Sequence, residues 1–381
     1  MPFAYLDLDL LGQNIQQVIS RAKGKRVRLA SKSIRSEPVL RRILEADPTF
    51  QGIMCFTARE AVYLASKGFR DLLIGYPAWH QDDYQAVARA IQGGAQITVM
   101  VDSRAHLERI QEIASAYQVT LPVCLDIDMS LPIPGLHFGV WRSPLRTPDQ
   151  VRPLLELIRA SPALRLDGIM GYEAQIAGVG DHYPGKPLKN YVVRRLQQRS
   201  AREVARRREA IVSLIESMGL PLRLVNGGGT GSIATTKTEA KVTEITVGSA
   251  FYGPALFDNY RAFHYLPAAG FAIEIVRQPA PSIFTCLGGG YVASGATGAD
   301  KLPQPYLPTG AYLIPQEAAG EVQTPIRYSG EQVSLHPGDP IFLRHSKAGE
   351  LCERFDRLAL VQNGAVVDEA PTYRGDGQCF L

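Results

Sequence analysis

Up to about residue 260, short apolar runs alternate along the chain with segments whose apolar residues recur at helical spacing. Short apolar runs flanked by such segments are typical of strands buried in a parallel sheet. We predict eight of these strands, at Val27–Ala30, Gly52–Phe56, Leu72–Gly75, Ile97–Val101, Val123–Ile127, Gly168–Tyr172, Leu222–Val225 and Glu244–Val247. Helices are predicted between them, among others at Ser36–Ala46, Ala58–Lys67, Ser103–Tyr117 and Pro148–Ala160. This alternation predicts a (β/α)8 TIM-type barrel, in which functional side chains lie at the carboxyl ends of the strands.

The rest of the chain has a different pattern. From about Phe271 it is rich in Pro and Gly, and short β-type runs predict a mainly antiparallel β domain. Its predicted strands are Ala272–Val276, Ala311–Ile314, Gln332–Leu335, Pro340–Arg344 and Leu358–Gln362, with Phe3–Leu8 as a strand added from the N-terminus. We therefore expect the barrel at residues 10–262 and the β domain at residues 1–9 plus 263–381. The polar segment Gly288–Gly298 is expected to be a binding loop.

The composition is that of an ordinary globular protein, with 45% hydrophobic and 20% charged residues among 381. No apolar run approaches the length of a membrane span, and the first residues lack the basic and then apolar layout of a signal peptide. The 5 cysteines are scattered and have no CxxC spacing, which is typical of reduced thiols. We expect a cytoplasmic protein that does not bind membranes.

The charge distribution argues against nucleic acid as a partner. The formal net charge is only +4, and the one dense basic stretch, Arg194–Arg208, also carries Glu203 at helical spacing. We interpret this stretch as a solvated helix face, because no aromatic residue is interleaved with it. An RNA-binding protein would need salt-sensitive association, for which the sequence offers little support.

One lysine stands out for its position. Lys32 follows the apolar run Val27–Ala30, where a parallel barrel presents reactive side chains. A lysine there can form a Schiff base with an aldehyde cofactor if its surroundings keep part of it neutral. The alternative is an exposed lysine in a basic loop, since Lys25 and Arg35 are close in sequence.

Two small-residue turns follow later strands. In Leu224–Ser232 an apolar run leads into Gly227, Gly228, Gly229 and Thr230, a composition whose backbone N–H groups and hydroxyls suit a phosphate. The spacing is neither that of a P-loop nor that of a dinucleotide fingerprint, and a purely structural turn is the alternative. In Val247–Gly253 small residues precede Tyr252, whose hydroxyl either reaches a ligand or is satisfied within the core.

These segments, in this order, resemble fold-type III pyridoxal-phosphate (PLP) enzymes. The similarity is to the branch of the alanine racemase N-terminal-domain superfamily that contains D-threonine aldolases and D-serine dehydratases. Its members alternate strands and helices in the same way, so the resemblance covers most of the chain. It rests on six segments: Ala30–Arg35, Gly52–Ala61, Asp71–Pro77, Asp126–Val140, Gly227–Thr230 and Gly248–Gly253.

The resemblance implies PLP as cofactor and gives roles to individual residues. Lys32 would hold the PLP aldehyde and remove the α-proton of the substrate, because the cofactor supplies the electron sink and the protein supplies proton transfer. The phosphate would be bound by Gly228, Gly229, Thr230, Ser249 and Tyr252.

Other residues would contact the cofactor ring. Thr246 stands where alanine racemases place an arginine against the pyridine nitrogen, and a neutral partner leaves that nitrogen unprotonated more often. His137 stands where relatives commonly carry an arginine beneath the ring, with a structural histidine as the alternative. In Gly171–Gly178 a glutamine, Gln175, replaces the tyrosine of relatives, so Tyr172 and Gln175 are candidate contacts only.

The chain departs from its relatives near the C-terminus. They bind a divalent metal through His-x-Asp or His-x-Cys, whereas here His345 is followed by Lys347, and an ammonium group cannot ligate a metal. One interpretation is that Glu350 or Cys352 supplies the second ligand from a rearranged loop. The other is a metal-free site, in which Lys347 replaces the charge of the metal and holds the β-hydroxyl or carboxylate of the substrate. A third interpretation is that Lys347 is a surface lysine beside a packed His345.

The implied reaction belongs to a lyase. The resemblance favours aldol cleavage of D-configured β-hydroxy amino acids, with His345 and Lys347 as further catalytic residues. Dehydration of D-serine or D-threonine and racemisation are alternatives; racemisation needs a second base, for which Tyr291 and Tyr306 are candidates. A further class of protein to consider is a PLP carrier that catalyses no reaction. The resemblance also implies a homodimer that acts on small amino acids.

Overall fold

The chain divides into two compact units. The computed structural model describes residues 2–296, 298–330 and 333–381. The barrel unit contains Ile19–Ser31, Ile43–Val247 and Phe380–Leu381, and the sheet unit contains Met1–Val18, Lys32–Arg42 and Gly248–Cys379. Helices α1 (Leu8–Ala22) and α2 (Glu37–Ala46) cross this division. The units therefore interleave along the sequence, and the expected boundaries at residues 9 and 262 stay a prediction.

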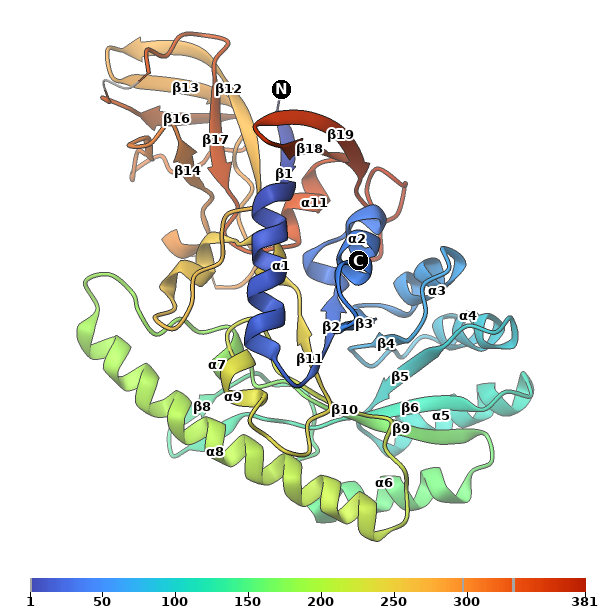
Figure 1. The fold of residues 1–381 in the computed structure, drawn as a ribbon. Coiled ribbons are helices and arrows are strands. Elements are labelled where there is room, and N and C mark those ends of the chain that lie inside the picture. Colours follow the sequence, from blue (N-terminus) through green and yellow to red (C-terminus); the bar gives the residue numbers. More distant parts are fainter. Residues whose placement is uncertain (1, 297, 331–332) are drawn as a thin grey trace. The chain divides into compact units, whose positions relative to one another are not determined.

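The barrel unit contains a closed parallel barrel, as predicted (Figure 1). Its strand order is β10-β11-β2-β3-β4-β5-β6-β9. The strands are β2 (Arg26–Ala30), β3 (Phe50–Cys55), β4 (Leu72–Ile74), β5 (Ile97–Val101), β6 (Leu121–Asp126), β9 (Leu164–Gly171), β10 (Leu224–Gly227) and β11 (Glu244–Val247). All eight predicted strands are confirmed; β5 and β11 match residue for residue, whereas β9 begins at Leu164 rather than Gly168.

Helices follow the barrel strands. They are α3 (Ala58–Ser66), α4 (Gln81–Gln92), α5 (Arg104–Ala116), α6 (Pro148–Ala160), α7 (Ala174–Ala177), α8 (Pro187–Ser217) and α9 (Ile233–Thr236). Their starts have local causes: the Thr147 hydroxyl accepts from the Gln150 N–H and the Gln150 side chain bonds back, a capping box that begins α6. A hairpin that the sequence pattern did not predict, β7 (Leu131–Ile133) with β8 (Leu136–Phe138), lies between β6 and α6.

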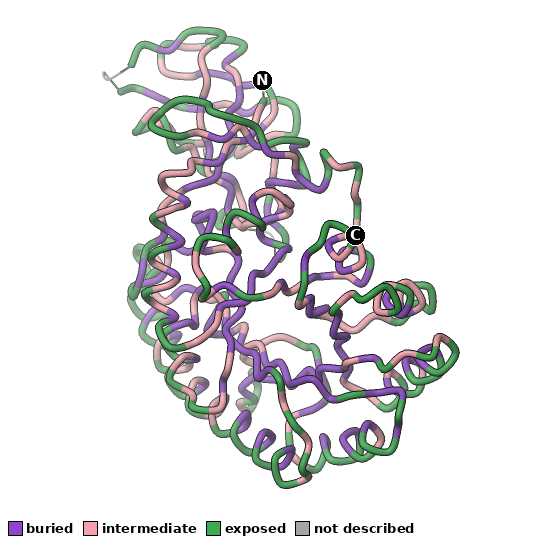
Figure 2. The backbone as a smooth tube through the Cα atoms, turned by 45° about the vertical axis from the view of Figure 1, so that its right-hand side comes forward, coloured by how far each residue is buried: buried purple, intermediate pink, exposed green. Residues whose placement is uncertain are grey.

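Apolar side chains from neighbouring strands fill the barrel. A buried cluster joins Leu73, Met100, Cys124, Met170 and Leu224, one residue from each of five adjacent strands. Met54 and Tyr172 pack against this cluster. Figure 2 shows the strands mainly in the buried colour and the outer helix faces exposed. This packing holds the strand ends in a fixed arrangement, on which any site at those ends depends.

The sheet unit is mainly antiparallel, as predicted. Its 9-stranded sheet runs β15-β16-β13-β12-β1-β18-β19, and β17 pairs with β12 and β14. The strands are β1 (Phe3–Asp7), β12 (Ala269–Ala280), β13 (Ile283–Leu287), β14 (Gln304–Leu307), β15 (Tyr312–Leu313), β16 (Gln323–Arg327), β17 (Pro340–Arg344), β18 (Arg357–Gln362) and β19 (Ala365–Pro371), with short helices α10 (Ser249–Tyr252) and α11 (Glu350–Arg354).

Two of the strands predicted for the β domain can be compared with the structure in detail. Phe3–Asp7 does form a strand of this sheet, antiparallel to β12 and parallel to β18. The predicted strand Gln332–Leu335 is wrong for residues 333–335, which are irregular, and Gln332 lies outside the described residues. In the part of the chain that the structure describes, no helix is both long and apolar enough to span a membrane.

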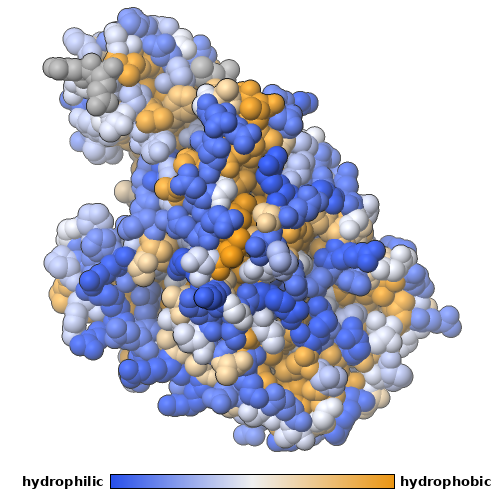
Figure 3. Space-filling model, in the orientation of Figure 1, coloured by the Kyte–Doolittle hydropathy of each residue, from blue (hydrophilic) through white to orange (hydrophobic). Residues whose placement is uncertain are grey.

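The basic stretch Arg194–Arg208 lies on α8, and most of its arginines are exposed, as interpreted. The surface over this helix, at the lower left of Figure 3, is mainly hydrophilic. Arg207 and Arg208 are exceptions, because both are buried. The interpretation as a solvated face is therefore wrong for these two, whose charge is neutralised inside the fold.

Candidate active site

Three of the predicted motifs follow three neighbouring strands of the barrel. Lys32 lies two residues after β2, Gly228 directly follows β10, and Ser249 lies two residues after β11. In the barrel β11 pairs with both β10 and β2. Since all these strands are parallel, the three motifs follow carboxyl ends at one edge of the barrel. The predicted closed barrel already implied that the last strand lies beside the first, and the pairing of β11 with β2 confirms it.

The segment after Lys32 is tightly held within the sheet unit. The Ile34 carbonyl accepts hydrogen bonds from the Tyr252 hydroxyl at 2.9 Å and from the Cys352 thiol at 3.3 Å. The backbone of Gly349 comes so close to the Lys32 carbonyl that a Cβ at that glycine would lie 2.3 Å from the oxygen. Gly349 also has φ +107°, a conformation that favours glycine. The structure therefore brings Lys32 and the segment His345–Cys352 together.

Tyr252 is a buried residue whose hydroxyl makes a hydrogen bond within the protein. Its side chain is fully buried, and burial raises the pKa of its hydroxyl well above the usual value. The hydroxyl proton is used in the bond to Ile34. Ser249 is better placed for a ligand, because it is only partly buried and its hydroxyl lies 3.4 Å from that of Ser33.

His345 is a buried histidine whose ring nitrogens have no hydrogen-bond partner among the described residues. It is 3% exposed, and among the described residues neither imidazole nitrogen makes a hydrogen bond, although the Ala269 backbone lies near enough to affect its titration. Burial, and then Arg344, lower its pKa to about 3, so the ring is neutral. Its backbone is fixed, because its carbonyl accepts from the Ala255 N–H at 3.1 Å. A buried polar group without a partner calls for an explanation, and an absent ligand is one.

Lys347, two residues further, is half-buried. Its Nζ donates to the Ser294 carbonyl at 2.7 Å. Burial lowers its pKa, and so do Lys301 and Lys32, while Glu350 and Asp300 raise it. These two lysines and two carboxylates are therefore its charged surroundings.

The two other proposed metal ligands are held by other contacts, although Glu350 Oε2 is buried without a hydrogen-bond partner in the described part of the chain. One oxygen of Glu350 accepts from the Ser294 N–H at 3.0 Å and hydroxyl at 2.7 Å. Cys352 is buried against the Ile34 carbonyl, and burial raises the pKa of its thiol to about 12. Within the described ranges, no group of three His, Cys, Asp or Glu residues could hold a metal ion.

The glycine turn is organised by a buried carboxylate that the sequence analysis missed. Glu173 accepts from the Gly228 N–H at 3.2 Å, from the Ser232 hydroxyl at 2.9 Å, and from the Thr236 hydroxyl. Arg208 neutralises it, with 3.3 Å between the charged atoms. The Gly229 N–H donates to the Ser232 hydroxyl at 3.0 Å.

The N–H groups of both predicted phosphate-binding glycines therefore already have partners in this structure. Gly228 also has φ +80°, and a Cβ there would lie 2.6 Å from Ile245, so glycine is needed for the shape of the turn. Thr230, which follows and is buried, is the residue of the turn that offers a side-chain hydroxyl. One sequence feature pointed to the network around Glu173: the basic pair Arg207–Arg208 inside a helix that packs on the barrel.

Thr246 is the end of a second buried polar network. The Asn226 amide donates to Thr246 Oγ1 at 2.8 Å and to Glu244 Oε1 at 2.8 Å. Glu244 pairs with Arg28 at 2.7 Å, and Arg28 is itself fully buried. These side chains come from β10, β11 and β2. Charged residues within otherwise apolar strands were the sequence signal for this network.

The remaining predicted contacts lie after β6 and β9. His137 stacks on Trp141, with ring centroids 3.7 Å apart. The Gln175 amide nitrogen donates to the Met129 carbonyl and the Ser200 hydroxyl, both at 2.6 Å. His137 Nε2 and Gln175 Oε1 are buried and lack a hydrogen-bond partner in the described part of the chain. Arg142 lies over the Tyr172 ring at 5.1 Å.

Asp126, at the end of β6, gives a testable pH dependence. Burial raises its pKa from 3.8 to about 7; Arg142 lowers it, while Asp102 and Asp128 raise it. The folded state then binds a proton that the unfolded state releases near pH 4, so the free energy of unfolding should fall as pH rises from about 4 to about 7. In urea unfolding at several pH values, Asp126→Asn should remove this part of the slope. Equal slopes for both proteins would contradict it.

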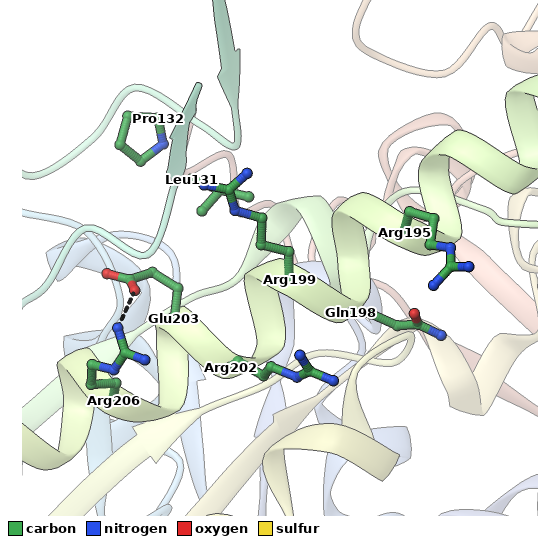
Figure 4. A pocket seen from close by; sticks show the side chains of 8 residues that line it. All are labelled: Leu131, Pro132, Arg195, Gln198, Arg199, Arg202, Glu203 and Arg206. Atoms are coloured by element: carbon green, nitrogen blue, oxygen red, sulfur yellow. Dashed lines mark ion pairs between the residues drawn. The ribbon is translucent and has the colours of Figure 1, made fainter. Parts of the chain in front are cut away.

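A separate hollow lies on the outer side of the barrel unit, along α8. It is a cavity of about 610 Å³ lined by Leu131, Pro132, Arg195, Gln198, Arg199, Arg202, Glu203 and Arg206. Figure 4 shows that most of these side chains come from one helix, with an ion pair between Glu203 and Arg206. None of the predicted site residues lines it, so we do not include it in the candidate active site.

Comparisons with known proteins agree with this arrangement. The family described as alanine racemase, N-terminal domain, matches residues 6–255. The 3-hydroxy-D-aspartate aldolase of Paracoccus denitrificans (strain Pd 1222) is 27% identical over 250 residues, which are 65% of this chain and 59% of that relative. The chain thus matches about three fifths of the length of its curated relatives.

Solved structures share the fold over nearly the whole chain. D-threonine aldolase from Filomicrobium marinum superposes with a TM-score of 0.83 at 19% identity, covering 98% of this chain and 95% of that one. D-threo-3-hydroxyaspartate dehydratase from Delftia sp. HT23 gives 0.76 at 18% identity, covering 98% and 97%. A cysteine-to-alanine variant of such a dehydratase was solved in a metal-free form, with a TM-score of 0.75 at 18% identity, covering 98% and 97%.

Proposed function

Since the chain belongs to the family of the alanine racemase N-terminal domain, we propose that it is a PLP-dependent lyase that cleaves D-configured β-hydroxy amino acids. The observation that carries this proposal is the position of Lys32. It follows strand β2, and the next two barrel strands, β11 and β10, lead into the hydroxyl- and glycine-rich turns. A nucleophilic amine and a phosphate-binding turn at one barrel edge are what an aldehyde cofactor with a phosphate requires.

The residues present fit PLP. When bound, PLP supplies the electron sink for carbanion chemistry. Lys32 would hold its aldehyde, and the hydroxyls of Thr230 and Ser249 would bind its phosphate, with Gly228 and Gly229 shaping the turn. The buried, unpartnered His137 Nε2 and Gln175 Oε1 support the fit, because they are polar atoms that a ligand would satisfy. Thr246 would meet the pyridine nitrogen as a neutral partner.

Proton transfer in this proposal belongs to Lys32 and to groups near the β-carbon of the substrate. Lys32 Nζ would move the α-proton, and His345 and Lys347 would hold the oxygen on the β-carbon. Tyr172 and Gln175 would line the same site. Tyr252 would stand beside the phosphate, and its hydroxyl also donates to the Ile34 carbonyl near Lys32.

Aldol cleavage is placed ahead of the alternatives because two of the similar proteins above are named aldolases. Dehydration is the second candidate, since a structure of nearly the same coverage is a dehydratase. Racemisation is less well supported, because Tyr291 packs between Phe271 and Phe355, with ring centroids at 4.9 Å and 5.4 Å. A PLP carrier would leave the His345–Lys347 cluster unexplained. We also propose that the protein is a cytoplasmic homodimer, as the resemblance to its family implies.

The test is NMR of the PLP-loaded protein incubated with D-threonine in deuterated buffer. We expect glycine and acetaldehyde, and no product from L-threonine. 2-Oxobutyrate with ammonia would instead identify a dehydratase, and α-deuteration alone a racemase. An unchanged spectrum with D-threonine, D-serine and 3-hydroxy-D-aspartate would contradict the proposed lyase and favour the carrier.

A further inference from the structure

The segment after β17 carries a histidine and a lysine at the spacing where relatives carry two metal ligands. His345 has two buried nitrogens without hydrogen bonds in the described chain, and Lys347 stands at the position of the second ligand. The backbone of His345 and of the following Ser346 is held by hydrogen bonds. Residues 345 and 346 accept hydrogen bonds from the backbone N–H groups of Ala255 and Leu256, at 3.1 Å and 3.0 Å.

This segment does not fit a divalent cation. Metal binding needs several deprotonated oxygen, nitrogen or sulfur ligands. Among the described residues of this segment only the His345 ring and one oxygen of Glu350 lack a hydrogen-bond partner, and no three His, Cys, Asp or Glu residues come together. The Cys352 thiol bonds to the Ile34 carbonyl, and Glu350 holds the Ser294 backbone and hydroxyl. The half-buried ammonium of Lys347 would also repel a dication, whereas the neighbouring Lys301 is paired with Asp300.

The same geometry fits an oxygen ligand. Lys347 is anchored by one hydrogen bond to the Ser294 carbonyl, and an ammonium group has three donors. A Cβ placed on Gly295 would lie 3.5 Å from Lys347 Nζ, so the polar loop that contains Ser294 closes one side of the ammonium. His345 adds two buried ring nitrogens that make no hydrogen bond within the described chain. A hydroxyl group, which both donates and accepts, can bond to a ring nitrogen and to the ammonium.

We propose that in this chain the ammonium of Lys347 takes the place of a divalent metal ion, and that together with His345 it binds the oxygen on the β-carbon of the substrate. This inference rests on the proposed function for its substrate, a β-hydroxy-α-amino acid. The part of the inference that concerns metal binding does not depend on the proposed lyase activity. A fixed cation stabilises negative charge on the β-oxygen, as a Lewis-acidic metal would.

The first experiment measures metal directly. The full-length protein, purified in EDTA, is titrated with Mn²⁺ and Zn²⁺ by calorimetry. Wild type should bind neither ion specifically, whereas Lys347→Cys and Lys347→Asp, which restore a ligand two residues after His345, should bind about one ion per chain. The matched control, Lys301→Cys, removes a neighbouring lysine outside this spacing and should bind none. One ion bound by wild type, or none bound by either Lys347 variant, would overturn the inference.

The second experiment measures turnover of D-threonine. We expect the wild-type rate to be the same in EDTA and in Mn²⁺. Lys347→Met should lower kcat/KM on the order of 100-fold with the PLP absorbance unchanged, and Lys347→Arg should restore most of it. A Lys347→Met protein within twofold of wild type would overturn the inference. If wild type turns over none of the β-hydroxy substrates, the proposed function fails, and the calorimetry still decides the question of metal.

Discussion

Replacing Lys32 by alanine should lower the turnover of D-threonine by about 10³-fold or more, because the variant loses both the covalent anchor of PLP and the group that moves the α-proton. Proton transfer by a positioned side chain alone is worth roughly 10² to 10⁴-fold. The loss should appear in kcat with the fold intact, because the Lys32 side chain is exposed. Initial rates and the absorbance of bound PLP measure the two effects together.

Lys23→Ala is the matched control for this variant. Lys23 is also exposed, lies nine residues earlier and precedes β2 rather than following it. It should keep wild-type turnover and wild-type absorbance. A Lys32→Ala protein that has lost PLP but keeps its turnover would instead favour a carrier, because the reaction would then not depend on this lysine.

Replacing Arg28 by methionine should destabilise the barrel by about 3–5 kcal/mol, the loss expected when one partner of a buried ion pair is removed. Arg28 is fully buried, with Glu244 at 2.7 Å and Asp71 at 3.0 Å. Both carboxylates raise the pKa of Arg28, so it stays charged at every accessible pH. Its loss leaves Glu244 buried without a cation. Urea unfolding monitored by circular dichroism measures the change.

Arg41→Met is the comparison for Arg28. Arg41 pairs with Glu37 one helical turn away, both side chains reach solvent, and such pairs contribute well under about 1 kcal/mol. The double variant Arg28→Met/Glu244→Met should recover part of the loss, because no unpaired charge stays buried. An Arg28→Met protein as stable as Arg41→Met would show that the buried network is not needed for the barrel.

The barrel could be predicted from the sequence because hydrophobic periodicity reports burial directly. Apolar runs such as Ile97–Val101 and Glu244–Val247 have the length and spacing of parallel strands, and the structure matches both to the residue. The predictions failed for segments whose secondary structure is not set by the burial of apolar side chains. The β7–β8 hairpin is short and half exposed, and residues 333–335 have strand-like composition without a strand partner.

The site was harder to predict, because its polar partners come from distant parts of the chain. Lys32, the glycine turn and His345 were visible as local motifs. Glu173, which orders the turn, was not, because its partners Gly228, Ser232 and Arg208 lie 35 to 59 residues away in sequence. The same holds for Tyr252, whose hydroxyl meets the Ile34 carbonyl 218 residues away. A contact over that separation has no local sequence signal, and only the three-dimensional structure shows it.

The central claim is that Lys32 is the residue that holds PLP, and reductive trapping tests it most directly. The PLP-loaded protein is treated with borohydride, digested and analysed by peptide mass spectrometry. We predict one modified peptide, with the phosphopyridoxyl group on Lys32, and no modification in Lys32→Ala. A group trapped on another lysine, such as Lys347, or on none, would contradict the account.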